Sequence, residues 1–114
     1  MILVIGGKGS GKAAYVTSLG YAPEQIAHNI EAETPVLYGL QEIVAQNPAK
    51  AMELLEDLLK KEVVVCDEVG SGVIPLQREQ REFREATGRL CIALAREASQ
   101  VVRLVCGIPQ VIKP

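Results

Sequence analysis

Residues 1–12 read MILVIGGKGSGK, a short apolar run that leads into a glycine-rich loop. Met1 to Ile5 is continuously apolar, rich in β-branched residues and ended by glycine, which is typical of a buried parallel strand. The loop carries the spacing Gly6-x-x-x-x-Gly11-Lys12, and residues 12–19 continue as a helix. Because a phosphate-binding loop requires this position between strand and helix, the stretch predicts an α/β domain with a phosphate cradle.

The residue types of the loop suit phosphate chemistry. Glycines let the backbone wrap so that successive N–H groups point at phosphate oxygens, and Lys12 can reach the outer phosphates. A turn that merely joins strand to helix is the alternative. A dinucleotide fingerprint is disfavoured because Lys12 stands where the third glycine is required. The expected nucleotide-binding residues are Gly6, Gly7, Lys8, Gly9, Ser10, Gly11, Lys12 and Ala13.

Two features bear on a magnesium ion. The residue after the P-loop lysine is normally Ser or Thr, whose hydroxyl ligates the metal, but here it is Ala13. Phosphate binding survives this change, whereas metal-assisted phosphoryl transfer is compromised unless water or another side chain fills the position. Asp67 and Glu68 follow an apolar strand, as Walker B acids do, and are the candidate Mg²⁺ ligands. The alternative is a polar strand end that caps the following turn.

Further apolar runs and helical stripes extend the pattern along the chain. Asn47 is expected to cap a helix that starts at Pro48 and ends near residue 61. A longer helix is expected over 77–98, with glycine-punctuated or irregular loops over 20–34 and 69–75. Expected strands lie at 36–38, 63–66 and 101–106. This alternation predicts the α/β class, as a P-loop NTPase-like three-layer sandwich with a small, mostly parallel sheet of about four strands.

Length and composition limit the classes of protein. The 114 residues, 48% of them hydrophobic, suit one nucleotide-binding domain over residues 1–114. A net charge of −2 disfavours a nucleic-acid partner, and no apolar run reaches bilayer length, so no membrane partner is expected. The three cysteines lie in apolar segments without paired ligand spacing, which favours reduced core thiols over zinc. Without a recognisable leader, a cytoplasmic location is expected.

His28 is the only histidine of the chain, and it lies in the irregular stretch beside Asn29 and Glu31. A histidine in such surroundings is most often a solvated loop residue. Arg84 and Arg89 of the expected long helix could reach phosphates, but helix arginines of this kind commonly pair with neighbouring acids. Neither arginine is therefore taken as a catalytic residue.

Three groups of residues carry a specific resemblance. They are Asp67-Glu68-Val69-Gly70-Ser71-Gly72-Val73-Ile74-Pro75, then Phe83-Arg84 with Gly88-Arg89, then Gly107-Ile108-Pro109 with Lys113. Together they resemble the C-terminal half of the bifunctional adenosylcobinamide kinase/adenosylcobinamide-phosphate guanylyltransferase family of cobalamin biosynthesis. The loop over residues 6–12 is similar to the P-loop of that family. The resemblance covers residues 1–20 and 63–114.

The resemblance implies an activity. Members phosphorylate the aminopropanol hydroxyl of adenosylcobinamide with GTP or ATP, and then transfer GMP from GTP through a guanylylated histidine. It implies that Lys12 and the loop amides bind phosphates, that Glu68 lies at the metal, and that His28 is the guanylyl acceptor. Adenosylcobinamide is thus an implied partner, and homo-oligomers are implied by the shared fold.

The chain departs from the family pattern in length and in catalytic motifs. Members are longer between the first helix and the third strand, so the sequence is identified as a shortened and divergent member. Its catalytic motifs are partly missing, since Ala13 replaces the metal-ligating hydroxyl. The alternative function is a catalytically impaired nucleotide- or corrinoid-binding module that acts as a sensor or as a partner of another enzyme.

Overall fold

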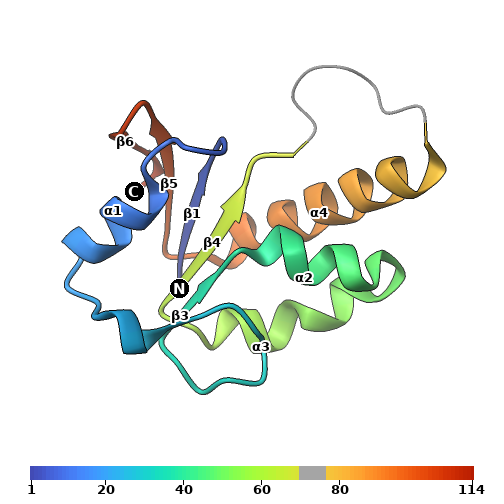
Figure 1. Cartoon of the computed structure of the whole chain (residues 1–114), viewed down its shortest axis with the longest axis horizontal. Coiled ribbons are helices and arrows are strands. Elements are labelled where there is room, and N and C mark those ends of the chain that lie inside the picture. The colour runs from blue at the N-terminus through green and yellow to red at the C-terminus, as the bar shows by residue number, and fades with distance from the viewer. Residues whose placement is uncertain (70–76) are drawn as a thin grey trace.

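The apolar runs of the sequence form one mixed sheet with helices on both faces, as Figure 1 shows for this computed structural model. The structure describes residues 1–69 and 77–114. The strand order is β2-β3-β4-β1-β5-β6, with β1 to β5 parallel and β6 antiparallel to β5. The strands are β1 (Ile2–Gly6), β2 (Ile26–Ala27), β3 (Val36–Tyr38), β4 (Val63–Asp67), β5 (Gln100–Val105) and β6 (Ile108–Lys113).

Helices form the two outer layers. Helix α1 (Lys12–Ser18) covers one face, and α2 (Leu40–Gln46), α3 (Leu55–Leu59) and α4 (Arg78–Glu97) cover the other (Figure 1). Two 3₁₀ segments, η1 (Pro23–Gln25) and η2 (Pro48–Leu54), complete the described helical structure. Successive strand side chains point to opposite faces, so Leu3 packs under α2 to α4 while Val4 packs under α1. Each face of the sheet therefore has its own buried core.

The predicted α/β class and layering are confirmed, but the sheet has two strands more than expected. The two-residue β2 extends one edge, and β6 extends the other. Cys106 and Gly107 join β5 to β6 with positive φ angles of 49° and 77°, as a tight hairpin turn requires. Pro109 is tolerated in β6 because an edge strand leaves one row of N–H groups unpaired.

Several local predictions were wrong. Asn47 makes no side-chain capping bond in the described structure, and Pro48 begins a 3₁₀ segment in place of an α-helix. Helix α2 was not expected; it begins at Leu40, and the φ of 83° at its N-cap residue Gly39 is left-handed. The predicted loop over 69–75 lies outside the described residues except for Val69.

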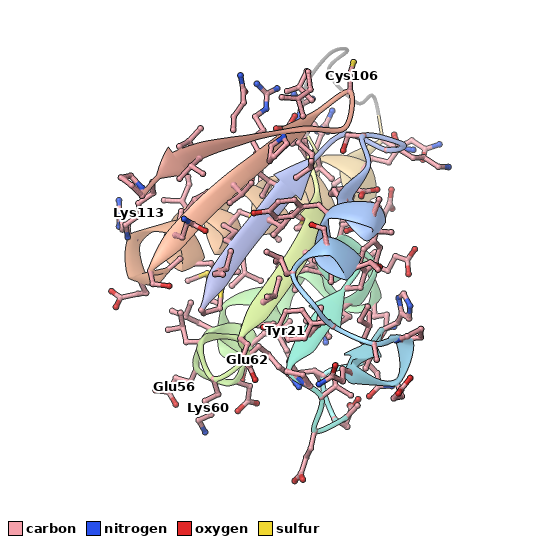
Figure 2. All side chains as sticks on the ribbon, turned by 90° about the vertical axis from the view of Figure 1, so that its left-hand side faces the viewer. Tyr21, Glu56, Lys60, Glu62, Cys106 and Lys113 are labelled. Carbon is pink, nitrogen blue, oxygen red and sulfur yellow. The ribbon has the colours of Figure 1, made fainter. Side chains whose placement is uncertain are left out.

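The cysteines differ in environment. Cys66 is buried and Cys91 is half-buried, but Cys106 is exposed, which corrects the expectation of a core thiol there. Figure 2 shows Cys106 at one end of the molecule, with Glu56 and Lys60 at the opposite end. The C-terminal strand is held at Lys113, whose ammonium donates to the carbonyls of Ala95 and Arg96, both at 2.9 Å.

Within the described ranges, no helix combines the length and the apolar composition that a membrane crossing needs.

Candidate phosphate-binding site

The glycine loop connects β1 to α1 at the carboxyl edge of the sheet. Gly9 and Gly11 have φ angles of 76° and 96°, a left-handed conformation that glycine adopts without steric cost. The Ser10 N–H donates to the Gly7 carbonyl at 3.1 Å, and the Tyr15 N–H donates to the Gly11 carbonyl at 3.0 Å as α1 begins. The backbone therefore turns tightly into the helix, as a phosphate cradle requires.

Lys12 is the central charged residue of the site. Its side chain is only 3% exposed, and Nζ lies 2.7 Å from the Gly7 carbonyl oxygen and 2.8 Å from Asp67 Oδ1. Gly6 and Asp67 are register partners on neighbouring parallel strands, so the carboxylate emerges beside the loop. A buried ammonium is costly without such partners. The Gly7 carbonyl and the Asp67 carboxylate therefore hold the lysine ammonium at the loop.

Ser10 contributes a buried hydroxyl to the loop. Among residues 1–69 and 77–114, its Oγ finds no hydrogen-bond partner. The hydroxyl lies over Gly6, where an added Cβ would collide with it. Buried polar groups are normally paired, so this hydroxyl has unused capacity for a ligand oxygen or a water molecule.

The β5–β6 turn supports the loop from outside. The Gly107 N–H donates to the Ser10 carbonyl at 2.8 Å, and a Cβ at Gly11 would lie 3.1 Å from Gly107 Cα. Sequence reasoning did not assign this role to Gly107. The signal that could have indicated it is Gly107-Ile108-Pro109, which was noted only as part of the resemblance.

The two adjacent acids have different ion-pair partners. Asp67 contacts Lys12, whereas both Glu68 oxygens face Arg103 of β5, with Nε–Oε1 at 2.5 Å and Nη2–Oε2 at 3.2 Å. Arg103 lies two residues from Val101, whose side chain packs under α2 to α4. The Glu68 carboxylate raises the pKa of Arg103. Arg103 is a charged residue between the apolar residues Val102 and Leu104 of β5, a signal that sequence reasoning missed.

The fit of a magnesium ion rests on Asp67. Mg²⁺ is commonly held by one or two carboxylates together with substrate phosphates and water. Asp67 is 27% exposed and lies beside the loop, while Glu68 would first have to release Arg103. The residues that the structure describes contain no group of three metal-ligating side chains. The donor set therefore fits a metal that arrives with the nucleotide.

His28 is placed apart from the loop. It is exposed, follows β2, and contacts the Tyr38 ring edge-to-face with the centroids 5.6 Å apart. Strands β3 and β4 lie between β2 and β1. At about 4.8 Å per strand, β2 lies about 14 Å from the P-loop strand. His28 and Lys12 share the carboxyl edge of the sheet, but the structure does not bring them into contact.

Comparison with known proteins matches most of the chain to one family. A sequence model described as "Cobinamide kinase / cobinamide phosphate guanyltransferase" matches residues 16–112. The chain belongs to this family. The match begins after the glycine loop, so the phosphate-binding assignment of the loop rests on its own sequence and geometry.

Curated relatives from two bacteria support the cobinamide kinase family assignment. The "Bifunctional adenosylcobalamin biosynthesis protein CobU" of Escherichia coli is 43% identical over 53 residues, and the protein of the same name from Salmonella typhimurium has the same identity and match length. Each match covers 46% of this chain and 29% of the relative. The sequence-based resemblance is confirmed, and the matched segment spans less than a third of each relative.

In this member of the cobinamide kinase family, the structure brings only some of the predicted site residues together. Lys12 and Asp67 meet at the loop, while Glu68 pairs with Arg103 and His28 lies toward the far edge. Lys8 and Ala13 are exposed on the loop and on α1. The Gln41 side chain, which sequence reasoning did not single out, fixes the strand end by accepting the Asp67 N–H at 2.9 Å.

Proposed function

We propose that the chain binds GTP or ATP in the loop from Gly6 to Lys12 and transfers the terminal phosphate to a hydroxyl of adenosylcobinamide. The observation that carries this proposal is the buried Lys12 ammonium, held at 2.7 Å from Gly7 O and 2.8 Å from Asp67 Oδ1. The family membership supports the acceptor, since the matching family is named for cobinamide phosphorylation.

The residues of the loop would act mainly by binding and orientation. Lys12 would exchange the Gly7 carbonyl for a phosphate oxygen, while Asp67 keeps the ammonium in place. Loop amides and the Ser10 hydroxyl would donate to further phosphate oxygens. Phosphoryl transfer depends largely on such positioning and on charge stabilisation. A Mg²⁺ ion held by Asp67 and the phosphates would supply neutralisation of the charge on the transferred group.

Ala13 supports a second candidate, the binding module without catalysis. The side chain at this position has no hydroxyl, so one protein ligand of the metal is lost. A binding module would still be stabilised by nucleotide, but with little dependence on the metal. The two candidates therefore differ in their response to Mg²⁺ and in turnover.

A thermal-shift titration with GTP and ATP, with and without Mg²⁺, tests the proposal. Nucleotide at 100 times its Kd stabilises a protein by about 2.7 kcal/mol, which raises Tm by about 10 °C for a domain of this size. Asp67→Asn keeps a hydrogen-bond acceptor for Lys12 but removes the charge. We expect this variant to lose the Mg²⁺-dependent part of the shift and to keep the metal-free part.

Glu68→Gln is the matched control, and phosphorylated cobinamide is measured in parallel by mass spectrometry. The control should keep the Mg²⁺-dependent part of the Tm shift, because both carboxylate oxygens of Glu68 already accept hydrogen bonds from Arg103. A larger loss with Glu68→Gln would reverse the assignment of the metal ligand. Nucleotide binding without formation of phosphorylated cobinamide would support the binding module without catalysis. The absence of any Tm shift with nucleotide would reject both candidates.

The guanylyl transfer half of the family activity is proposed for His28. Its neutral imidazole would attack the α-phosphate of GTP, form a nitrogen–phosphorus bond and expel pyrophosphate. Its exposure at the carboxyl edge of the sheet supports access for a nucleotide. We expect α-labelled GTP to give a protein adduct that is labile to acid, and His28→Gln to reduce labelling to background.

Tyr38→Phe serves as the control for this experiment, because it keeps the ring that contacts His28. Labelling that persists in His28→Gln would exclude the histidine as the acceptor. No labelling of the unaltered chain would restrict the proposal to the kinase step.

A further inference from the structure

A pocket lies between α4 and the strand ends beside the glycine loop. It has a volume of about 290 Å³. Thr87, Gly88 and Cys91 line it from α4, and Asp67 and Glu68 line it from the end of β4. Since residues three and four apart share a face of a helix, the three α4 residues belong to one face. Ligands of open α/β sheets bind in the crevice outside the carboxyl ends of the strands, and this pocket occupies that position.

Asp67 is common to this pocket and to the phosphate-binding site. Its Oδ1 lies 2.8 Å from Lys12 Nζ. A P-loop lysine reaches the outer phosphates of a nucleotide, so the pocket adjoins the end of the nucleotide that is transferred and not the base. A hydroxyl that attacks the terminal phosphate needs such a position, because reacting atoms must approach to about 3–3.5 Å.

The lining of the pocket suits a neutral chain that carries a hydroxyl group. Ile5, Val69 and Cys91 supply largely apolar surface. The described lining includes two carboxylates and neither lysine nor arginine, which disfavours an anionic ligand. An ionised carboxylate only accepts hydrogen bonds and offers about four lone-pair sites. Asp67 and Glu68 therefore keep capacity to accept a hydrogen bond from a hydroxyl group.

Gly88 leaves space in the wall that α4 contributes. A glycine inside a helix destabilises the helix relative to alanine. Close packing does not require glycine here, because an added Cβ would meet no described atom within 4 Å. A cavity of about 150 Å³ is large enough for benzene. The pocket, with its larger volume, therefore accommodates a short aliphatic alcohol.

We propose that this pocket binds the hydroxyl-bearing arm of the phosphate acceptor, and that Gly88 is the residue that admits the arm. The inference rests on the proposed function, which supplies adenosylcobinamide as the acceptor. The apolar part of the arm packs against Ile5 and Val69, and its hydroxyl points toward Asp67, beside the terminal phosphate. A larger side chain at position 88 would take the space of the arm without touching the glycine loop.

The test compares Gly88→Leu with the unaltered chain in two binding measurements. Equilibrium dialysis, read by the absorbance of the corrin ring, gives the Kd of adenosylcobinamide, and isothermal titration gives the Kd of GTP and of ATP. We expect Gly88→Leu to raise the Kd of adenosylcobinamide about 10-fold or more, because leucine overfills the pocket. The Kd of each nucleotide should not change. Leucine favours a helix more than glycine does, so the variant should fold.

Two controls separate the arm from other effects. Glu85→Leu places the same side chain on α4 at a position that is 68% exposed and outside the lining of this pocket, and it should change neither Kd. A corrinoid that lacks the hydroxyl-bearing arm should bind equally to the unaltered chain and to Gly88→Leu. Weaker binding of this corrinoid to Gly88→Leu would place the ring in the pocket and overturn the proposal.

The remaining outcomes distinguish this inference from the proposed function. An unchanged Kd of adenosylcobinamide in folded Gly88→Leu would overturn the inference, as would an equal rise in the Kd of nucleotide. Nucleotide binding by an unaltered chain that does not bind adenosylcobinamide would also overturn it. Adenosylcobinamide binding that is sensitive to Gly88→Leu, without any nucleotide binding, would contradict the proposed function alone. If Gly88→Leu does not fold, Cys91→Leu fills the same pocket and decides the outcome.

Discussion

Replacing Lys12 with methionine should weaken nucleotide binding about 100-fold. Methionine retains the apolar stem of the buried side chain, so the change removes mainly the ammonium that lies beside Gly7 and Asp67. Charge-assisted hydrogen bonds contribute about 1.5–3 kcal/mol each, and about 2.8 kcal/mol corresponds to a factor of 100 in Kd. Isothermal titration with GTP and ATP measures the change directly.

Lys60→Met provides the matched control, because Lys60 is 78% exposed and lies at the end of the molecule opposite Cys106 (Figure 2). Its nucleotide affinity should equal that of the unaltered chain. If the Lys12→Met protein is folded and binds nucleotide with unchanged affinity, the Lys12 ammonium does not bind the phosphates, and the proposed function is contradicted.

Gly11→Ala should lower the free energy of unfolding by about 2–4 kcal/mol. The φ of 96° at Gly11 is left-handed, which costs an ordinary residue about 1–2 kcal/mol. The added Cβ would also lie 3.1 Å from Gly107 Cα, and overpacking of this kind costs about 1–3 kcal/mol. The corresponding fall in Tm is about 10 °C or more, measured by thermal unfolding in the absence of nucleotide.

Gly88→Ala is the control of opposite sign for this experiment. Gly88 lies inside α4, and an added Cβ there meets no described atom within 4 Å. Alanine in a helix interior should stabilise the protein by about 0.5–1 kcal/mol. Equal Tm values for the two variants would contradict the close contact between the glycine loop and the β5–β6 turn.

The central strands of the fold could be predicted because burial leaves a continuous apolar run in the sequence. This holds for Val63 to Cys66, which are all fully buried. The edge strand β6 carries no such signal, since Ile108, Val111 and Ile112 are more than half exposed and Pro109 interrupts the run. Helix α2 was missed because its first turn depends on the backbone conformation of Gly39 and has no side-chain cap in the described structure.

In the candidate site, too, features that are local in the sequence could be predicted, whereas features that depend on long-range contacts could not. The glycine loop is contiguous, and Asp67 directly follows the apolar run of its strand, so both could be identified from the sequence. The pairing of Glu68 with Arg103 depends on β4 and β5 lying on either side of β1, and strand order is not visible in a single sequence. The support of the loop by Gly107 depends on the same neighbouring strands.

The hairpin of β5 and β6 connects two distant parts of the molecule. At its turn, the Gly107 N–H donates a hydrogen bond to the Ser10 carbonyl of the glycine loop. At its other end, the Lys113 ammonium donates hydrogen bonds to carbonyl oxygens of α4. The exposed Cys106 adjoins the first of these contacts, while Cys66 is buried. An environment-sensitive dye coupled to Cys106 would therefore report movement of the glycine loop from a position outside that loop. The fluorescence of the dye would then serve as an optical signal of ligand binding.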